Sequence, residues 1–187
     1  MKQFLLMLIA AACLQASAIE YAGMKIDDTA KVAGRELVLN GYGLRIKYVI
    51  VKAYVGALYM PEKTKDGEAV IASNAPRRMS MTMLRKIQVE DLYKSLVEGM
   101  NNNATPAEMA ALAPQLKQVK EGFDTVNTLD KGDVVTMDFI PGKGSVISVK
   151  GKPFETIEGD NFSRTILRIW FGKKPIQEDL KANLLAG

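Results

Sequence analysis

Histidine is absent from this 187-residue chain, and cysteine occurs once, at Cys13. Without imidazole the chain cannot build a Ser-His-Asp or Cys-His catalytic unit, a His-ligated metal site or an imidazole acid–base group. If Cys13 is removed with a leader peptide, disulfides, thiolate catalysis and zinc–cysteine sites are excluded as well. Any catalysis must then use carboxylate, lysine, tyrosine or arginine side chains.

Long apolar runs are also scarce, and the one clear run lies at the N-terminus. The segment MKQFLLMLIAAACLQASA has a basic start at Lys2, an apolar stretch over residues 4–14 and a small-residue cleavage pattern ending at Ala18. The stretch is too short for an ordinary spanning helix, and no later segment offers the roughly 18 apolar residues that spanning requires. We therefore expect a signal peptide over residues 1–18, cleaved after Ala18, and a periplasmic or secreted domain over residues 19–187 with no transmembrane segment.

Cys13 allows a second interpretation of the leader, in which it is the lipidated cysteine of a lipoprotein. The preceding residues Ala10, Ala11 and Ala12 lack the leucine that is usual three positions before such a cysteine. Cleavage after Ala18 is therefore the preferred prediction, and lipidation stays open.

The overall composition is that of an ordinary soluble domain, with 48% apolar residues, 25% charged residues and a formal net charge of +4. The length suits one folding unit with a sizeable core. Basic residues are interspersed with acids and lack interleaved aromatic side chains, so we expect no nucleic-acid partner. Those that come nearest to a cluster are Lys117, Lys120, Lys131, Lys173 and Lys174.

Residues 40–60, NGYGLRIKYVIVKAYVGALYM, read as one long extended stretch that begins with turn chemistry at Asn40-Gly41. Over residues 49–60 both faces are mainly apolar, which is typical of a strand covered on both sides, so we place it at the centre of a sheet. Arg45 and Lys47 interrupt this pattern. Such a charge is either a solvated strand edge or the polar anchor of a pocket.

Methionines mark a second predicted strand, in the segment RRMSMTMLRKI. Met79, Met81 and Met83 alternate with polar residues, which is the period of a strand. Because methionine is flexible and polarisable, these side chains suit the wall of an adaptable apolar cavity. They would serve equally well as ordinary core residues.

The apolar period becomes helical after residue 89, which predicts a helix that Asn101-Asn102-Asn103 ends. Thr105 and Glu108 have the spacing of a capping box around a proline at the first helical position, so a new helix starts there. Pro114 is expected to divide that helix into two pieces.

Strands return after residue 132, with a hairpin turn predicted at Pro141-Gly142-Lys143-Gly144. A helix follows from Asn161, with Asp160 as its expected cap, and a short helix closes the chain. Strands, then helices, then a hairpin, then helices predict an α+β fold with a mainly antiparallel sheet.

Three stretches resemble the chalcone isomerase-like family, in particular its bacterial secreted branch: Gly43-Leu44-Arg45, KAYVGALYM and IWFGKKPIQEDLKANLLAG. The resemblance implies an open-faced β-sandwich, in which a layer of helices backs the sheet and a ligand cleft lies between them. It also implies that Arg45 is the counterpart of the arginine with which the plant enzymes hold a phenolate. A guanidinium suits that role because it is permanently charged and offers a planar fork to an oxyanion.

The rest of the enzyme pattern matches less well. Tyr54 stands where the enzymes have a threonine hydroxyl beside the reacting ketone. Tyr93 fits the position of a substrate-facing tyrosine, but Met100 stands where the enzymes have an asparagine. A thioether is at best a weak hydrogen-bond acceptor, so the substitution counts against catalysis.

These residues predict a non-catalytic protein that binds a small apolar ligand with an acidic or phenolic head group, a fatty acid before all others. Haem held by its propionates is a further possibility, with Met, Tyr or Lys as axial ligand. No cofactor is required and no other metal site is expected. The predicted ligand-binding residues are Arg45, Tyr54, Met79, Met81, Met83, Tyr93 and Met100.

The alternative function is that of an intramolecular lyase of the chalcone isomerase type. In that case Arg45 would hold the oxyanion, and Tyr54 or Tyr93 would polarise the carbonyl of the substrate. Such a reaction needs no histidine, so whether the chain is an enzyme stays open, and the missing threonine and asparagine favour binding.

Overall fold

The computed structural model describes residues 18–154 and 156–187. The predicted leader lies outside these residues except for Ala18, and so does Cys13. Within the described part, none of the helices is both long and apolar enough to cross a membrane.

A seven-stranded sheet in the order β11-β10-β9-β6-β5-β4-β3 forms the centre of the fold, and all its neighbouring strands are antiparallel. The pairs β1-β2 and β7-β8 form two small sheets. The strands are β1 (Ala18–Tyr21), β2 (Met24–Asp27), β3 (Thr29–Val32), β4 (Arg35–Lys47), β5 (Val51–Met60), β6 (Arg77–Met83), β7 (Ile87–Gln88), β8 (Thr128–Leu129), β9 (Val134–Ile140), β10 (Gly144–Val149) and β11 (Lys152–Pro153).

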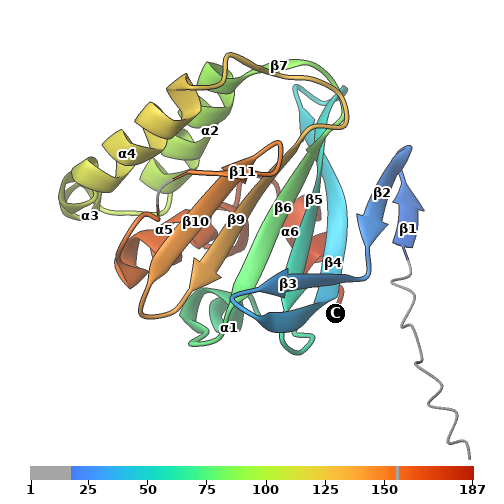
Figure 1. Cartoon of the computed structure of the whole chain (residues 1–187), viewed down its shortest axis with the longest axis horizontal. Coiled ribbons are helices and arrows are strands. Elements are labelled where there is room, and N and C mark those ends of the chain that lie inside the picture. The colour runs from blue at the N-terminus through green and yellow to red at the C-terminus, as the bar shows by residue number, and fades with distance from the viewer. Residues whose placement is uncertain (1–17, 155) are drawn as a thin grey trace, which may run out of the picture.

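Helices back one face of this sheet, and in Figure 1 α5 and α6 lie behind it. The helices are α1 (Gly67–Ala72), α2 (Val89–Asn101), α3 (Pro106–Ala111), α4 (Ala113–Asp124), α5 (Asp160–Phe171) and α6 (Glu178–Leu184). This arrangement confirms the predicted α+β fold with a mainly antiparallel sheet backed by helices.

Residues 40–60 form parts of two strands, which corrects the prediction of one long stretch. β4 and β5 pair antiparallel as far as Lys47↔Val51, and Tyr48, Val49 and Ile50 make the turn between them. The φ angles of Tyr48 and Val49 are +49° and +69°. Tight hairpin turns of this kind favour Asn and Gly, and because neither residue is present, no turn signal was visible in the sequence.

Asn40 and Gly41 lie inside β4, so the turn predicted there is wrong. They occupy a bulge, where the register with β5 shifts between Leu39 and Gly41. The buried Asn40 amide donates to the carbonyl oxygens of Leu184, at 2.7 Å, and Thr64, at 3.0 Å. Asn40 therefore anchors the end of α6 to the sheet instead of reversing the chain.

β5 contributes to two cores because its side chains alternate between the faces of the sheet. Tyr54 and Leu58 belong to the main core beneath the helices, whereas Val55 and Ala57 belong to a smaller core on the other face. That smaller core includes residues of the β1-β2 hairpin and of β3 and β4. Both faces of β5 are thus covered, as the apolar pattern predicted, but the prediction is wrong for Val49 and Ile50, which lie in the turn before β5 and are exposed.

The predicted helix caps and the predicted break at Pro114 are confirmed, with one exception. Thr105 and Glu108 form the predicted capping box, and α3 gives way to α4 at Leu112, with Pro114 in the first turn of α4. Asp160, however, does not cap α5. The helix starts after Gly159, and the Asp160 carboxylate accepts a hydrogen bond from the backbone N–H of Gly142 at 3.2 Å, which ties α5 to the β9-β10 turn.

Candidate functional site

A cavity of about 680 Å³ lies between the sheet and helices α2 and α5, a volume typical of small-molecule sites. Its wall is mostly apolar and is built by Ala53, Met81, Leu96, Met137, Ile169 and Trp170. Charged side chains also line it, namely Arg45, Lys47, Arg85, Lys86, Asp91, Lys94 and Glu98. Cations outnumber acids in this lining, so an anionic group is favoured there over a cationic one.

Arg45 lines the cavity from the face of β4 that is turned toward the helices. It is paired across the strands with Tyr54, and farther along the same face Gly43 is paired with Gly56 beneath α6. The next pair is Ile46 with Lys52, so Ala53 is the extra residue of a β-bulge. Because of this bulge, Ala53 and Tyr54 both line the cavity although they are neighbours in a strand.

The Arg45 guanidinium has only neutral partners. Its Nη1 donates to the carbonyl oxygen of Ile46 at 2.6 Å and to Oε1 of Gln177 at 3.3 Å. Over residues 18–154 and 156–187, the buried Nε has no acceptor and the side chain forms no ion pair with a carboxylate. The Nε–Nη2 edge, with which arginine grips a carboxylate in a bidentate pair, is therefore not used by the protein.

Gln177, just before α6, holds this part of β4 in place. Beyond β3, β4 has an open edge, and Gln177 satisfies its backbone there: its Nε2 donates to the carbonyl of Leu44 at 3.2 Å and its Oε1 accepts from the N–H of Ile46 at 2.8 Å. The same Oε1 accepts from Arg45. The side-chain amide thus fixes both the strand edge and the guanidinium at the side of the cavity.

Tyr54, the cross-strand partner of Arg45, places a second polar group beside the apolar wall of the cavity. Its hydroxyl oxygen accepts a hydrogen bond from the indole Nε1 of Trp170 at 3.1 Å, and both side chains are buried. Burial raises the pKa of the Tyr54 phenol, whereas the Trp170 hydrogen bond and the charge of Arg45 lower it in part. The phenol is therefore protonated at neutral pH, and its own hydrogen can be donated to a ligand.

Replacing Tyr54 with phenylalanine should lower the free energy of unfolding by about 1–3 kcal/mol, because the buried indole N–H of Trp170 would lose its acceptor. Urea unfolding measures the loss, and the emission of Trp170, the only tryptophan, should shift at the same time. Tyr93→Phe is the matched control, with an expected cost below about 1 kcal/mol. Equal costs for the two variants would contradict the role assigned to the buried pair.

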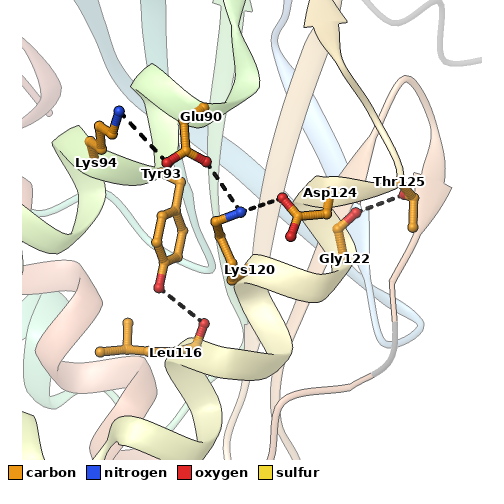
Figure 2. Close-up of polar contacts among 8 residues, drawn as sticks. All are labelled: Glu90, Tyr93, Lys94, Leu116, Lys120, Gly122, Asp124 and Thr125. Atoms are coloured by element: carbon orange, nitrogen blue, oxygen red, sulfur yellow. Dashed lines mark hydrogen bonds and ion pairs between the residues drawn. The ribbon is translucent and has the colours of Figure 1, made fainter.

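Four of the predicted site residues do not line this cavity. Met79, Met83 and Met100 are fully buried in the main core, which is the alternative that the sequence left open for the first two. Tyr93 faces α4 instead, and Figure 2 shows its hydroxyl pointing at the Leu116 carbonyl oxygen, 3.3 Å away. Of the seven predicted residues, the structure therefore brings together Arg45, Tyr54 and Met81.

The environment of Tyr93 is that of a helix-packing residue. Its ring packs edge-on against Phe123 of α4, with the ring centroids 6.4 Å apart. Lys120, also on α4, lies 5.8 Å from the ring centroid and bridges Glu90 and Asp124 (Figure 2). Tyr93 thus joins α2 to α4 on the side away from the cavity.

Trp170, Met137 and Ile176 line the cavity but were not assigned to it from the sequence. Trp170 and Ile176 belong to the closing segment that carried the family resemblance. The sequence therefore singled out this segment but did not indicate that it lines a cavity. Met137 follows the same alternation in β9 that marked the methionines of β6, and it is paired with Met79. The described residues contain no group of three His, Cys, Asp or Glu side chains that could hold a metal ion.

Comparisons with known proteins agree with this architecture. Residues 18–186 match the family model described as chalcone isomerase-like. Among solved structures, the chain is similar to the crystal structure of a fatty-acid binding protein of Arabidopsis thaliana, with a TM-score of 0.71 and 11% sequence identity. That match covers 90% of this chain and 96% of the plant chain. A search of curated proteins finds no match.

Proposed function

The chain belongs to the chalcone isomerase-like family, and we propose that it is a non-catalytic binding protein that holds a fatty acid with the carboxylate at Arg45. One observation carries the proposal: within the described residues, the arginine at this cavity has only neutral partners and keeps its Nε–Nη2 edge unused. A partly buried guanidinium is usually paired with an anion, and a bound carboxylate would supply the partner that the described residues do not.

The polar end of the cavity suits a carboxylate. The Nη2 group of Arg45 has no hydrogen-bond partner within the described residues, and a charge-assisted bond from it to a carboxylate is about twice as strong as a neutral hydrogen bond. The cross-strand partner Tyr54 adds a hydroxyl donor on the same face. Together the two residues define a head-group site, and within the described residues neither Asp91 nor Glu98 of the cavity lining is paired with the guanidinium.

The apolar wall suits an alkyl chain. Met81, Met137, Ile169 and Trp170 line the same cavity as Arg45 and Tyr54, and the flexible methionines can adapt to chains of different length. The plant structure that shares the fold is named as a fatty-acid binding protein, which supports the same class of ligand here. At 11% identity it supports the fold and not the individual contacts.

The lyase alternative has less support from the geometry. Tyr93 lies outside the cavity, with its hydroxyl at the Leu116 carbonyl, so only Tyr54 could polarise a carbonyl beside Arg45. Met100, at the position of the enzymes' asparagine, is buried in the core. No observation favours this function over binding.

We further propose that the protein belongs to the bacterial secreted branch of the family and works outside the cytoplasm. The proposal rests on the leader pattern of residues 1–18. The exported protein should begin at Ile19, and its intact mass would show this. A mass that retains residues 1–18 would refute the cleavage.

Extraction of the purified, denatured protein should release a long-chain carboxylic acid in near-stoichiometric amount, identified by mass spectrometry. The stripped protein should then bind added fatty acid. Haem, the other proposed ligand, would appear as a Soret absorption band before denaturation, and turnover of naringenin chalcone above the spontaneous rate would indicate the lyase. Failure both to release and to bind any fatty acid would overturn the proposed function.

A further inference from the structure

The tip of the β4-β5 hairpin exposes three consecutive apolar side chains. Tyr48 is 85% exposed, Val49 90% and Ile50 82%, and they are the only large apolar side chains exposed to this degree in the described part of the chain. Single exposed apolar residues are ordinary, but three at the apex of one turn form a compact protrusion.

The backbone of this tip is also unfavourable for the residues it carries. Tyr48 and Val49 have φ angles of +49° and +69°, and a β-branched residue such as valine is a genuine outlier in that region. An Asn-Gly pair would adopt these positive φ angles readily and would place no apolar side chain in water. Folding therefore gains nothing from the side chains at this tip, which points to a contact outside the chain.

Exposed cations lie beside the tip, at the mouth of the cavity. Arg85 and Lys86 follow β6 and are held against β5 by the hydrogen bond from the Leu84 N–H to the Ala53 carbonyl, at 3.0 Å. They line the same cavity as Tyr48, and within residues 18–154 and 156–187 neither forms an ion pair. In Figure 1 the β4-β5 turn and the segment leading to β7 lie at the same end of the sheet.

We propose that this surface, Tyr48-Val49-Ile50 with Arg85 and Lys86, docks onto an anionic phospholipid membrane and seats the cavity mouth on it. The tip would enter the interface, where tyrosine is favoured between headgroups and acyl chains, and the cations would contact lipid phosphates. Three apolar residues are far too few for a stable protein interface, which buries about 800 Å² on each partner. The inference of docking depends only on this surface. Transfer of a fatty acid between the bilayer and the cavity would in addition require the proposed function.

Flotation with vesicles tests the docking. The protein should bind vesicles of phosphatidylglycerol and phosphatidylcholine, bind phosphatidylcholine alone at least about tenfold more weakly, and dissociate as salt screens the cations. Tyr48→Asn combined with Val49→Gly should reduce binding to the anionic vesicles at least about tenfold. This variant relieves the turn instead of straining it, so it should fold at least as well as the original chain.

Charge variants form the second arm of the test. Arg85→Gln with Lys86→Gln should weaken binding to anionic vesicles about tenfold. Lys63→Gln with Lys143→Gln removes the same charge from two exposed lysines beyond the other end of β5 and at the β9-β10 turn, and it should leave binding unchanged. Equal losses in both pairs would mean that net charge alone is responsible, and the proposed surface would be rejected.

Fatty-acid binding measured without vesicles separates this inference from the proposed function. A protein that binds fatty acid in solution but no vesicle would refute the docking and leave the function intact. A protein that docks through the tip but binds no fatty acid would refute the proposed function and leave the docking intact. If the tip instead mediates a dimer that the Asn-Gly variant dissolves, with no binding to vesicles, the membrane is the wrong partner and the inference fails.

Discussion

Arg45→Met should lower the affinity for a long-chain fatty acid by about 10- to 100-fold, which corresponds to the loss of a charge-assisted hydrogen-bonded pair. Methionine keeps most of the side-chain volume and removes the only cation that lies directly across the strands from Tyr54. Isothermal titration of the delipidated protein measures the change. The effect is large because no carboxylate of the described residues neutralises the guanidinium, so its charge is available to the ligand.

Two controls separate the charge from packing. Lys52→Met removes an exposed cation from the neighbouring strand that does not line the cavity, and it should change the affinity by less than about twofold. A fatty alcohol of the same chain length should bind the original chain and the Arg45→Met variant alike, since it has no carboxylate to lose. An equal drop for acid and alcohol would show that the substitution merely disturbed the cavity.

Gly41→Ala should lower the free energy of unfolding by about 3 kcal/mol or more, the upper range for overpacking. A Cβ at Gly41 would lie 2.3 Å from the carbonyl oxygen of Asn183 and 2.6 Å from that of Leu184. Both atoms are backbone near the end of α6, so the helix must move as a unit. Urea denaturation monitored by circular dichroism measures the loss.

Gly43→Ala is the graded control. Its Cβ would lie 2.8 Å from the Cβ of Asn183 and 3.2 Å from a methyl group of Leu180, a milder overlap than that at Gly41, so a cost of about 1–2 kcal/mol is expected. Displacing α6 also moves Gln177 away from Arg45, so Gly41→Ala should weaken fatty-acid binding in addition. A Gly41 variant no less stable than the Gly43 variant would contradict the close packing of α6.

The elements that the sequence predicted correctly are those with local causes. The capping box of Thr105 and Glu108, the break at Pro114 and the alternating methionines of β6 each depend on residues within one turn or one strand. The two errors in predicting turns arose where the local preference of the residues does not decide the path of the chain. Tyr48 and Val49 turn the chain although neither is a typical turn residue, and Asn40-Gly41 forms a bulge within β4 instead of a turn because Asn40 is bound to Thr64 and Leu184.

The candidate site was predictable in part. The alternation along β4 and the family resemblance together singled out Arg45, and the structure places it beside Tyr54 and Met81 at one cavity. Tyr93 could not be placed from its helix alone, because its hydroxyl lies against Leu116, 23 residues away. Which face of α2 meets the sheet and which meets α4 depends on how the helices pack.

The sequence by itself determined the fold class, the excluded chemistries and the guanidinium as the polar feature of an apolar strand, since these follow from composition and short-range pattern. Only the tertiary structure decided how that guanidinium is surrounded. Gln177 reaches it across 132 positions of the chain, and Trp170 reaches Tyr54 across 116. A cavity is the space left between such distant segments, so its shape and its free hydrogen-bond donors exist only once the segments have packed.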